Sequence, residues 1–255
     1  MMSETNQDYK ILLARINDLA DTALKTQAPQ WTDFLEPPER EQAEAALRWK
    51  TGVRFNSFGG YPKSERRRLV IYPDYYFAET IQPELAFLEI TPTAPGASPS
   101  HRDYLGALMS LGIHRHKVGD ILVAEGSAQV VVVPELADYI QLNLTTVSNY
   151  TVRIQAIDPE QLNLPDRREK EIRTTVASLR LDALAALGFG ESRTKMARDI
   201  KAEKVKVNWK PTRSPDLQLN PGDVISIRGR GRVEFREITG QSKKGRIGVV
   251  LVRLI

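Results

Sequence analysis

The chain has 255 residues, of which 41% are hydrophobic, enough for two or three domains with cores of their own. It contains no cysteine, which excludes disulfides and thiolate chemistry and fits a reducing compartment. No apolar run approaches the roughly 18 residues of a membrane span, and the first ten residues lack a basic-then-apolar signal pattern. We therefore expect a cytoplasmic protein.

Charge is unevenly distributed along the chain, although the net charge is only +4. Residues 167–255 hold 21 Lys and Arg against 10 Asp and Glu, a balance of +11, whereas residues 1–166 hold 15 against 22, a balance of −7. This asymmetry points to nucleic acid as the partner of the basic end. An anionic membrane is the competing target, and the absence of a long basic amphipathic helix or lipidation motif disfavours it.

Residues 1–68 are expected to form an N-terminal helical region. Apolar residues recur at helical spacing from Ile11 to Leu19, and residues 39–50 are rich in the helix formers Ala, Glu and Arg. Gly59 and Gly60 indicate a turn. The basic residues that follow could cradle a phosphate, but without Walker spacing an ordinary surface loop is the favoured interpretation.

The middle of the chain, residues 69–160, shows a β-β-α-β-β-α-β pattern. Its order is typical of a small ferredoxin-like α/β domain, an architecture shared with RRM modules. The predicted hairpin strands lack the exposed aromatics that stack bases in an RRM, so fold analogy alone assigns no RNA role here. The predicted strands are residues 69–72, 85–91, 120–124, 129–133 and 151–156, and the predicted helices are residues 104–111 and 136–144.

Two short helix patterns precede a β-patterned segment in residues 178–255. Asp182 is a candidate cap for the first helix, with Leu184 and Leu187 apolar, and Gly188 stands where a helix commonly stops. Ser192 is a candidate cap for the second.

The second helix pattern separates an apolar stripe from a basic face. Met196, Ala197 and Ile200 form the stripe, and the cations continue beyond the helix into the next segment. Eight cations against three carboxylates between residues 191 and 213 favour an anionic partner over a merely solvated face. The cations are Arg193, Lys195, Arg198, Lys201, Lys204, Lys206, Lys210 and Arg213.

This basic segment resembles the S4, or αL, RNA-binding domain, in register over about fifty residues. The matching residues are Arg180, Leu181, Asp182, Leu184, Leu187, Gly188, Ser192, Arg193, Ala197, Ile200, Val205, Val207, Asn208, Gly222, Asp223, Ile225 and Arg228.

A wider resemblance covers nearly the whole chain. The segments WTDFLEPPE, FGGYPKSERRRLVIYP, HRDYLGALMSLGIHRHKVGDI and VNWKP are similar to the YlmH family, whose cyanobacterial and plastid members are often labelled photosystem II S4 domain proteins. The resemblance implies an α+β protein with an N-terminal helical region, an RRM-like middle domain and a C-terminal S4 domain. It also implies binding of rRNA and tRNA on the large ribosomal subunit, in ribosome-associated quality control of stalled nascent chains, by a monomer without catalysis or cofactor.

One residue departs from the family pattern. Glu203 stands before the first strand of the S4 domain, where the family usually has Gly. A positive φ there would cost a non-Gly residue about 1 kcal/mol or more, so a local difference in the turn is expected.

Catalytic interpretations are weaker. His101-Arg102-Asp103 resembles the protein-kinase catalytic loop but lacks its companion motifs, so capping of the next helix by Ser100 or Asp103 is favoured. His114 and His116 are spaced like metal ligands but would need a carboxylate such as Asp120. Arg180-Leu181-Asp182 is similar to a pseudouridine synthase motif, but in those enzymes the catalytic domain follows the module, so we expect Asp182 to cap a helix here.

We therefore expect no catalytic or metal residues. The alternatives are an RNA-modifying enzyme and an RNA-binding regulator of cell division or photosystem assembly. The candidate RNA-binding residues are Arg180, Ser192, Arg193, Lys195, Arg198, Lys201, Lys204, Lys206, Asn208, Lys210, Arg228, Arg230 and Arg232.

Overall fold

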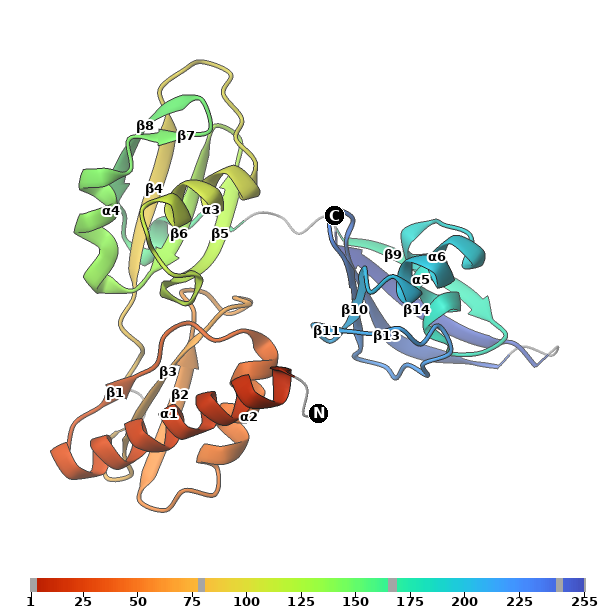
Figure 1. The fold of residues 1–255 in the computed structure, drawn as a ribbon, viewed down its shortest axis with the longest axis horizontal. Helices are drawn as coiled ribbons and strands as arrows, with labels where there is room; N and C mark the ends of the chain where they lie inside the picture. Colours follow the sequence, from red (N-terminus) through yellow and green to blue (C-terminus); the bar gives the residue numbers. More distant parts are fainter. Residues whose placement is uncertain (1–3, 78–80, 165–168, 242–244, 255) are drawn as a thin grey trace. The chain divides into compact units, whose positions relative to one another are not determined.

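The computed structural model describes residues 4–77, 81–164, 169–241 and 245–254. The chain forms two compact units, Met1–Pro165 and Asp166–Ile255 (Figure 1). Helix and sheet are mixed in the α+β manner expected. No described helix is long and apolar enough to cross a membrane.

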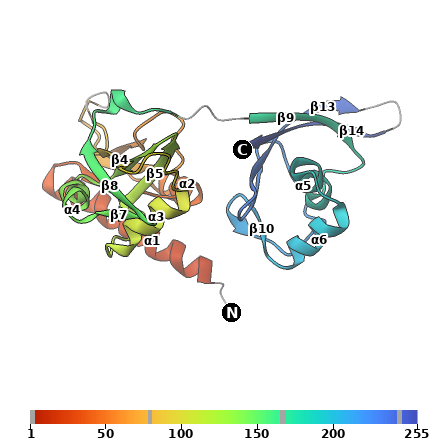
Figure 2. The ribbon, with the colours of Figure 1, turned by 90° about the horizontal axis from the view of Figure 1, so that it is seen from above.

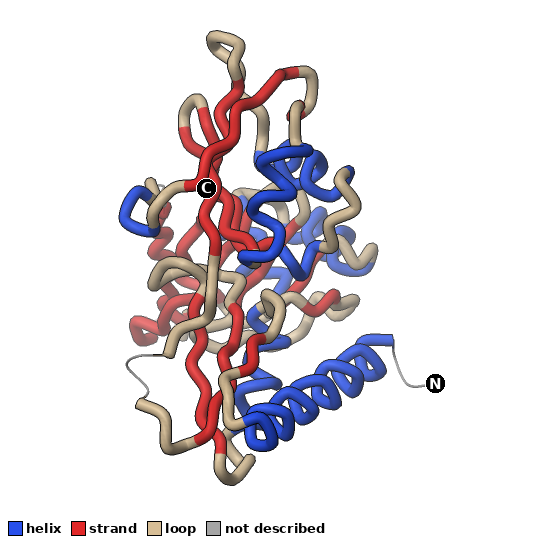
Figure 3. The backbone as a smooth tube through the Cα atoms, turned by 90° about the vertical axis from the view of Figure 1, so that its left-hand side faces the viewer, coloured by secondary structure: helices blue, strands red, loops and turns tan. Residues whose placement is uncertain are grey.

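The N-terminal part packs two helices against a small antiparallel sheet of order β1-β3-β2, and the long helix α1 lies beside its strands (Figure 3). Ile16, Leu47, Leu69 and Ile71 are buried in its core. The helices were expected, but the sheet was not. The elements are α1 Glu4–Thr26, β1 Gln30–Trp31, α2 Pro37–Leu47, β2 Val53–Phe58 and β3 Arg68–Pro73.

Strand β3 corrects the expected composition of the middle sheet. It was predicted as residues 69–72 and as the first strand of the middle domain, but it pairs with β1 and β2 instead. Every residue of β3 is buried, so no alternation of polar and apolar positions marks the sheet to which it belongs.

The middle domain has the antiparallel strand order β5-β6-β4-β8-β7, which agrees with the ferredoxin-like expectation. Helices α3 and α4 contribute Leu108 and Ile140 to a core that also holds Leu88, Ile90 and Val130. The elements are β4 Ala86–Pro92, α3 His101–Ser110, η2 Arg115–Lys117, β5 Val118–Ala124, β6 Ser127–Val132, η3 Pro134–Leu136, α4 Ala137–Asn143, β7 Thr146–Val147, β8 Tyr150–Ala156 and η4 Pro159–Gln161.

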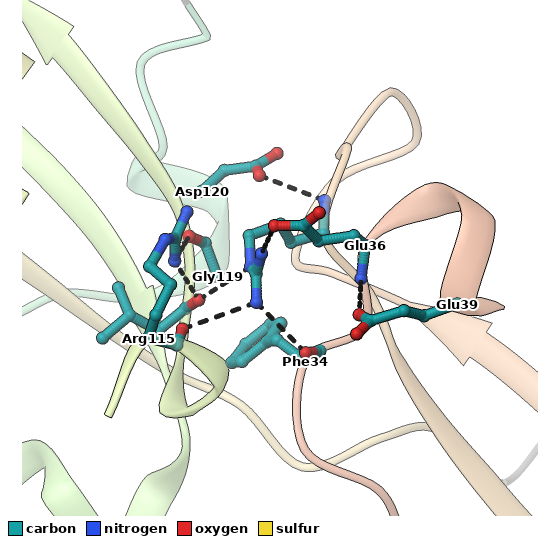
Figure 4. A network of polar contacts seen from close by, with 8 residues as sticks. Phe34, Glu36, Glu39, Arg115, Gly119 and Asp120 are labelled. Carbon is teal, nitrogen blue, oxygen red and sulfur yellow. Dashed lines mark hydrogen bonds and ion pairs between the residues drawn. The ribbon is translucent and has the colours of Figure 1, made fainter. Parts of the chain in front are cut away.

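A network of polar contacts joins the N-terminal part, at Phe34 and Glu36, to the middle domain, at Gly119 and Asp120 (Figure 4). Arg66, 6% exposed, donates from Nε to the carbonyl of Val118 at 3.1 Å and from Nη2 to the carbonyl of Phe34 at 3.2 Å. Its Nη1 lies 2.9 Å from Oε1 of Glu36. Nearby, burial and the charge of Arg66 lower the pKa of Arg115 to about 10.

Asp120 completes this junction from β5. Its carboxylate accepts hydrogen bonds from the hydroxyl of Tyr61 at 2.7 Å and from the backbone N–H groups of Glu65 and Arg66 at 2.7 and 3.1 Å. We call Arg66, Asp120 and these contacts the Arg66–Asp120 junction. All three bonds are internal, so Asp120 has a structural role.

The C-terminal unit is a sheet of order β11-β10-β12-β13-β14-β9 with α5 and α6 on one face (Figure 2). This is the S4 arrangement expected. The elements are β9 Glu169–Val176, α5 Leu181–Phe189, α6 Arg193–Lys201, β10 Val205–Val207, β11 Lys210–Pro211, β12 Val224–Ile227, β13 Gly231–Gln241 and β14 Ile247–Leu254.

Gly188 lies within α5 and does not end it, contrary to expectation. The helix ends at Gly190, which has a φ of +68°. A Cβ at Gly188 would lie 2.5 Å from Cγ1 of Val233, so the missing side chain lets α5 approach β13. Leu184 is fully buried in the core of this unit, whereas Leu187, predicted as its apolar partner, is 38% exposed.

Candidate nucleic-acid interface

Helix α6 carries the basic face predicted from the sequence. Ser192 caps it as expected, since its Oγ accepts a hydrogen bond from the backbone N–H of Lys195 at 3.2 Å. Met196 and Ile200 are fully buried. Burial of this stripe turns Arg198 and Lys201 toward solvent, where both side chains are exposed.

The exposed side of α6 borders a shallow groove of about 670 Å³ in the C-terminal unit. Three of its lining residues are cations from α6, and Asp182 of α5 is the one acidic side chain among the described residues that line it. Its lining is Asp182, Arg193, Thr194, Ala197, Arg198 and Lys201. A groove bordered by cations on one helix is suited to following a phosphate backbone.

The sequence suggested that Asp182 caps α5, but the structure shows that it does not. Arg180 occupies the cap position, and Asp182 lies in the first turn of the helix with only 6% of its surface exposed. Its carboxylate pairs with Arg193 Nη2 at 2.8 Å and Arg180 Nε at 3.2 Å. Burial raises the pKa of this carboxyl, but the hydrogen bonds from the two arginines outweigh burial and leave the pKa below its usual value.

The predicted cations differ in how far internal ion pairs engage them. Glu191 lies 2.8 Å from Lys195 and 2.6 Å from Arg230, and Lys204 lies 3.6 Å from Asp199. Hydrogen bonds from Lys195 and Arg230 hold the pKa of Glu191 below its usual value. Within the part of the chain that the structure describes, no ion pair engages Arg198, Lys201, Lys206 or Arg228. These four keep their charge available to an external anion.

Asn208 differs from the other candidates because both polar atoms of its side chain are used internally. Its Nδ2 donates to Asp223 at 2.7 Å, and its Oδ1 accepts from the backbone N–H of Val224 at 2.9 Å. Asn208 thus positions the loop after β10. That loop carries Trp209, which sequence reasoning did not select; its signal was an aromatic between Lys206 and Lys210.

Glu203 adopts the turn that its side chain disfavours. Its φ is +56°, and the backbone N–H groups of Glu203 and Lys204 donate to the carbonyls of Ile200 and Asp199 at 2.9 and 3.1 Å. These two bonds form a Schellman motif at the end of α6. The expectation that Glu203 would change the turn was therefore wrong. Glu203 adopts the positive φ despite the strain.

Relief of this strain leads to a stability prediction. Glu203→Gly should make the C-terminal unit more stable than Glu203→Ala by about 1 kcal/mol, because Ala keeps the positive-φ strain. Both variants lose the exposed ion pair with Arg213, which makes Ala the matched control. Amide hydrogen exchange of α6 measures the difference, and equal protection in the two variants would contradict it.

The Asp182 ion pairs lead to a pH prediction. Because the folded-state pKa of Asp182 is lowered, its contribution is present above the unfolded pKa of about 4 and is lost as pH falls through the folded value. Asp182→Asn should therefore destabilise the unit by about 1–2 kcal/mol at pH 7 and by less in acid. Urea unfolding at neutral and acid pH tests this, with Asp199→Asn as control; a pH-independent difference would be evidence against it.

The middle domain presents a different surface. Gln129, 4% exposed, donates to Glu89 Oε1 at 3.3 Å and to the carbonyl of Gln161 at 3.0 Å, and accepts from the N–H of Asn163 at 2.6 Å. The chain after β8 thus lies over the sheet at this point, beside an acidic side chain. Neither feature resembles the aromatic base-stacking surface of an RRM.

The residues considered for catalysis contact one another or their neighbours within the fold. Ser100 and Asp103 form a capping box at α3, in agreement with the favoured interpretation, and the hydrogen bonds from Ser100 lower the pKa of Asp103. The rings of His114 and His116 stack with centroids 5.2 Å apart. Among the described residues, no group of three or more potential ligands could hold a metal ion.

Comparison with known proteins identifies all three parts of the chain. Family models match residues 10–76 ("YlmH, N-terminal"), 82–161 ("Putative RNA-binding domain in YlmH") and 179–225 ("S4 domain"). The Ribosome-associated protein quality control protein P2 of Bacillus subtilis (strain 168) is 38% identical over 224 residues, covering 87% of this chain and 86% of that protein. Small ribosomal subunit protein uS4 of Marinobacter nauticus is 36% identical over 50 residues, covering 20% of this chain and 24% of that protein.

A solved structure supports the fold. Cell division protein ylmH from Streptococcus pneumoniae superimposes with a TM-score of 0.52 at 22% identity, covering 64% of this chain and 98% of that chain.

Proposed function

Since the chain belongs to the YlmH family, we propose that it binds rRNA and tRNA on the large ribosomal subunit, without catalysis, in ribosome-associated quality control of stalled nascent chains. The name of the Bacillus subtilis relative, 38% identical over most of both chains, supports this assignment. The S4 match supports RNA as the ligand.

One observation carries the proposal for this chain itself. Arg198 and Lys201 project from α6, whose opposite side is fixed by the buried Met196 and Ile200, and no described carboxylate pairs with them. Because the helix is fixed by its buried side, its backbone need not be ordered when phosphates bind these cations, which lowers the entropy cost of binding. The balance of +11 in residues 167–255 adds long-range attraction for a polyanion.

The candidate residues divide by role in this proposal. Arg198, Lys201, Lys206 and Arg228 bind phosphates directly. Arg180 and Arg193 act with Asp182, since an ion pair holds each guanidinium beside its carboxylate. The remaining candidates have supporting or flanking roles, and they are Ser192, Lys195, Lys204, Asn208, Lys210, Arg230 and Arg232.

Crosslinking in cells followed by sequencing of the bound RNA tests the function. We expect crosslinks concentrated in large-subunit rRNA and in tRNA, and their loss in a variant with Arg198→Gln and Lys201→Gln. Crosslinks mainly to mRNA, or a distribution unchanged in the variant, would contradict the proposal. Mass spectrometry of purified rRNA and tRNA incubated with the protein tests the absence of catalysis, because a protein-dependent modification would identify an enzyme.

A further inference from the structure

The turn after β10 contains a side chain that its backbone disfavours. Val207 pairs with Lys210, leaving a two-residue loop of Asn208 and Trp209 with φ values of +47° and +64°. Positive φ at both positions defines a type I′ hairpin turn, for which Asn-Gly is the favoured pair. A bulky residue at positive φ is an outlier and stores strain on the order of 1 kcal/mol. Trp209 occupies the place where Gly would make a more stable turn.

The ring of Trp209 lies on the side of the sheet that faces away from the helices. Arg232 places its guanidinium carbon 5.8 Å from the centre of the indole ring. Arg232 is paired across the sheet with Ser226, and Ser226 with Lys206. The neighbouring residues Val205, Ile225 and Val233 are buried in the core with α5 and α6. Because side chains alternate along strands, Lys206, Ser226 and Arg232 project from the opposite face.

Planar and cationic groups therefore meet on one partly exposed surface. Trp209 supplies an aromatic face, Arg232 a planar cation, and the exposed Lys206 and Lys210 flank the turn on either side. Aromatic rings and arginine planes stack on unpaired nucleobases, while lysines take the adjacent phosphates. A cation–π pair that only stabilised the hairpin would leave the strained Trp unexplained, since Gly would relieve the turn.

We propose that Trp209 and Arg232 form a stacking site for an unpaired nucleobase, with Lys206 and Lys210 on the flanking phosphates. This inference rests on the proposed RNA-binding function and deepens it, because it specifies single-stranded or looped RNA as the ligand of the sheet face. The phosphate-binding groove of α6 is built from other side chains, on the helical side of the same unit.

The substitution Trp209→Gly tests the site without damaging the turn. It creates the favoured Asn-Gly pair, so thermal stability should be equal to or higher than that of the wild type. Binding of the full-length chain is measured to two RNAs, a stem-loop with an unpaired purine loop and a blunt duplex with the same number of phosphates. We expect the variant to bind the stem-loop roughly 5- to 150-fold more weakly, which is the range for loss of one stacked base. Duplex binding should not change.

Two further variants separate stacking from other effects. Trp209→Phe keeps an aromatic face and should retain most of the stem-loop affinity. Trp49→Ala removes a tryptophan that is 90% exposed in the N-terminal part, and should bind both RNAs like the wild type. A 2-aminopurine in the loop should change its fluorescence with the wild type and not with Trp209→Gly.

The outcomes distinguish this site from the broader proposal. Wild-type stem-loop affinity in Trp209→Gly, or an equal loss on both RNAs, would overturn the stacking site while leaving RNA binding intact. A wild-type protein that binds neither RNA would overturn the proposed function and this site with it.

Discussion

Replacement of Arg198, Lys201 and Lys206 by Gln should weaken binding to large ribosomal subunits roughly a hundredfold at about 0.1 M salt. No described carboxylate engages these cations, so their charge is available to phosphates. Each lost phosphate contact should also reduce the log–log salt slope by roughly 0.7–0.9. Binding curves from low to moderate salt measure both quantities.

A matched control removes the same charge elsewhere. Lys25, Arg48 and Arg54 are exposed in the N-terminal part, and their replacement by Gln changes the net charge equally. If affinity depends on the surface of the C-terminal unit, the control should bind nearly as the wild type. Equal losses in the two triple variants would show that net charge alone drives binding and would refute the assigned surface.

Arg66→Ala should destabilise the N-terminal unit by about 3–5 kcal/mol. The guanidinium is buried and contacts Phe34, Glu36 and Val118, which are far from it in sequence. Removing it leaves two buried carbonyls without these donors and the Glu36 carboxylate without its cation. Urea unfolding, together with amide exchange of β3 and β5, measures the effect.

The neighbouring Arg67 is the control for this change. Among the described residues, its side chain donates only to carbonyls within the same loop, those of Ser64 and Pro62. Arg67→Ala should therefore destabilise the unit much less, although it removes the same kind of side chain from the adjacent position. Similar losses in both variants would show that the Arg66–Asp120 junction is not what stabilises the unit.

The features predicted correctly from the sequence are mostly local. Ser192 caps α6 through a residue three positions away, and the pair Ser100 and Asp103 caps α3 in the same way. The ferredoxin-like order followed from a run of strands and helices in the middle segment. The apolar stripe of α6 predicted which face of the helix is buried, because Met196 and Ile200 have helical spacing.

The features that were missed depend on contacts between distant residues. Asp is a residue type that often caps helices, but Asp182 instead pairs with Arg193, eleven residues later in the sequence. Strand β1 has only two residues, too few for any period. In the sequence Arg66 is one of several cations in a basic loop, and its contact with Val118, 52 residues later, forms only when the chain folds.

The close approach of α5 to β13 has a consequence for how this domain can evolve. A Cβ at Gly188 would lie within 2.8 Å of both γ carbons of Val233, and Val233 is itself fully buried. Ala at position 188 would favour the helix by up to about 1 kcal/mol, yet it can be accepted only when position 233 loses volume. The two positions should therefore covary among descendants of this sequence, so that a larger residue at position 188 is accompanied by a smaller one at position 233.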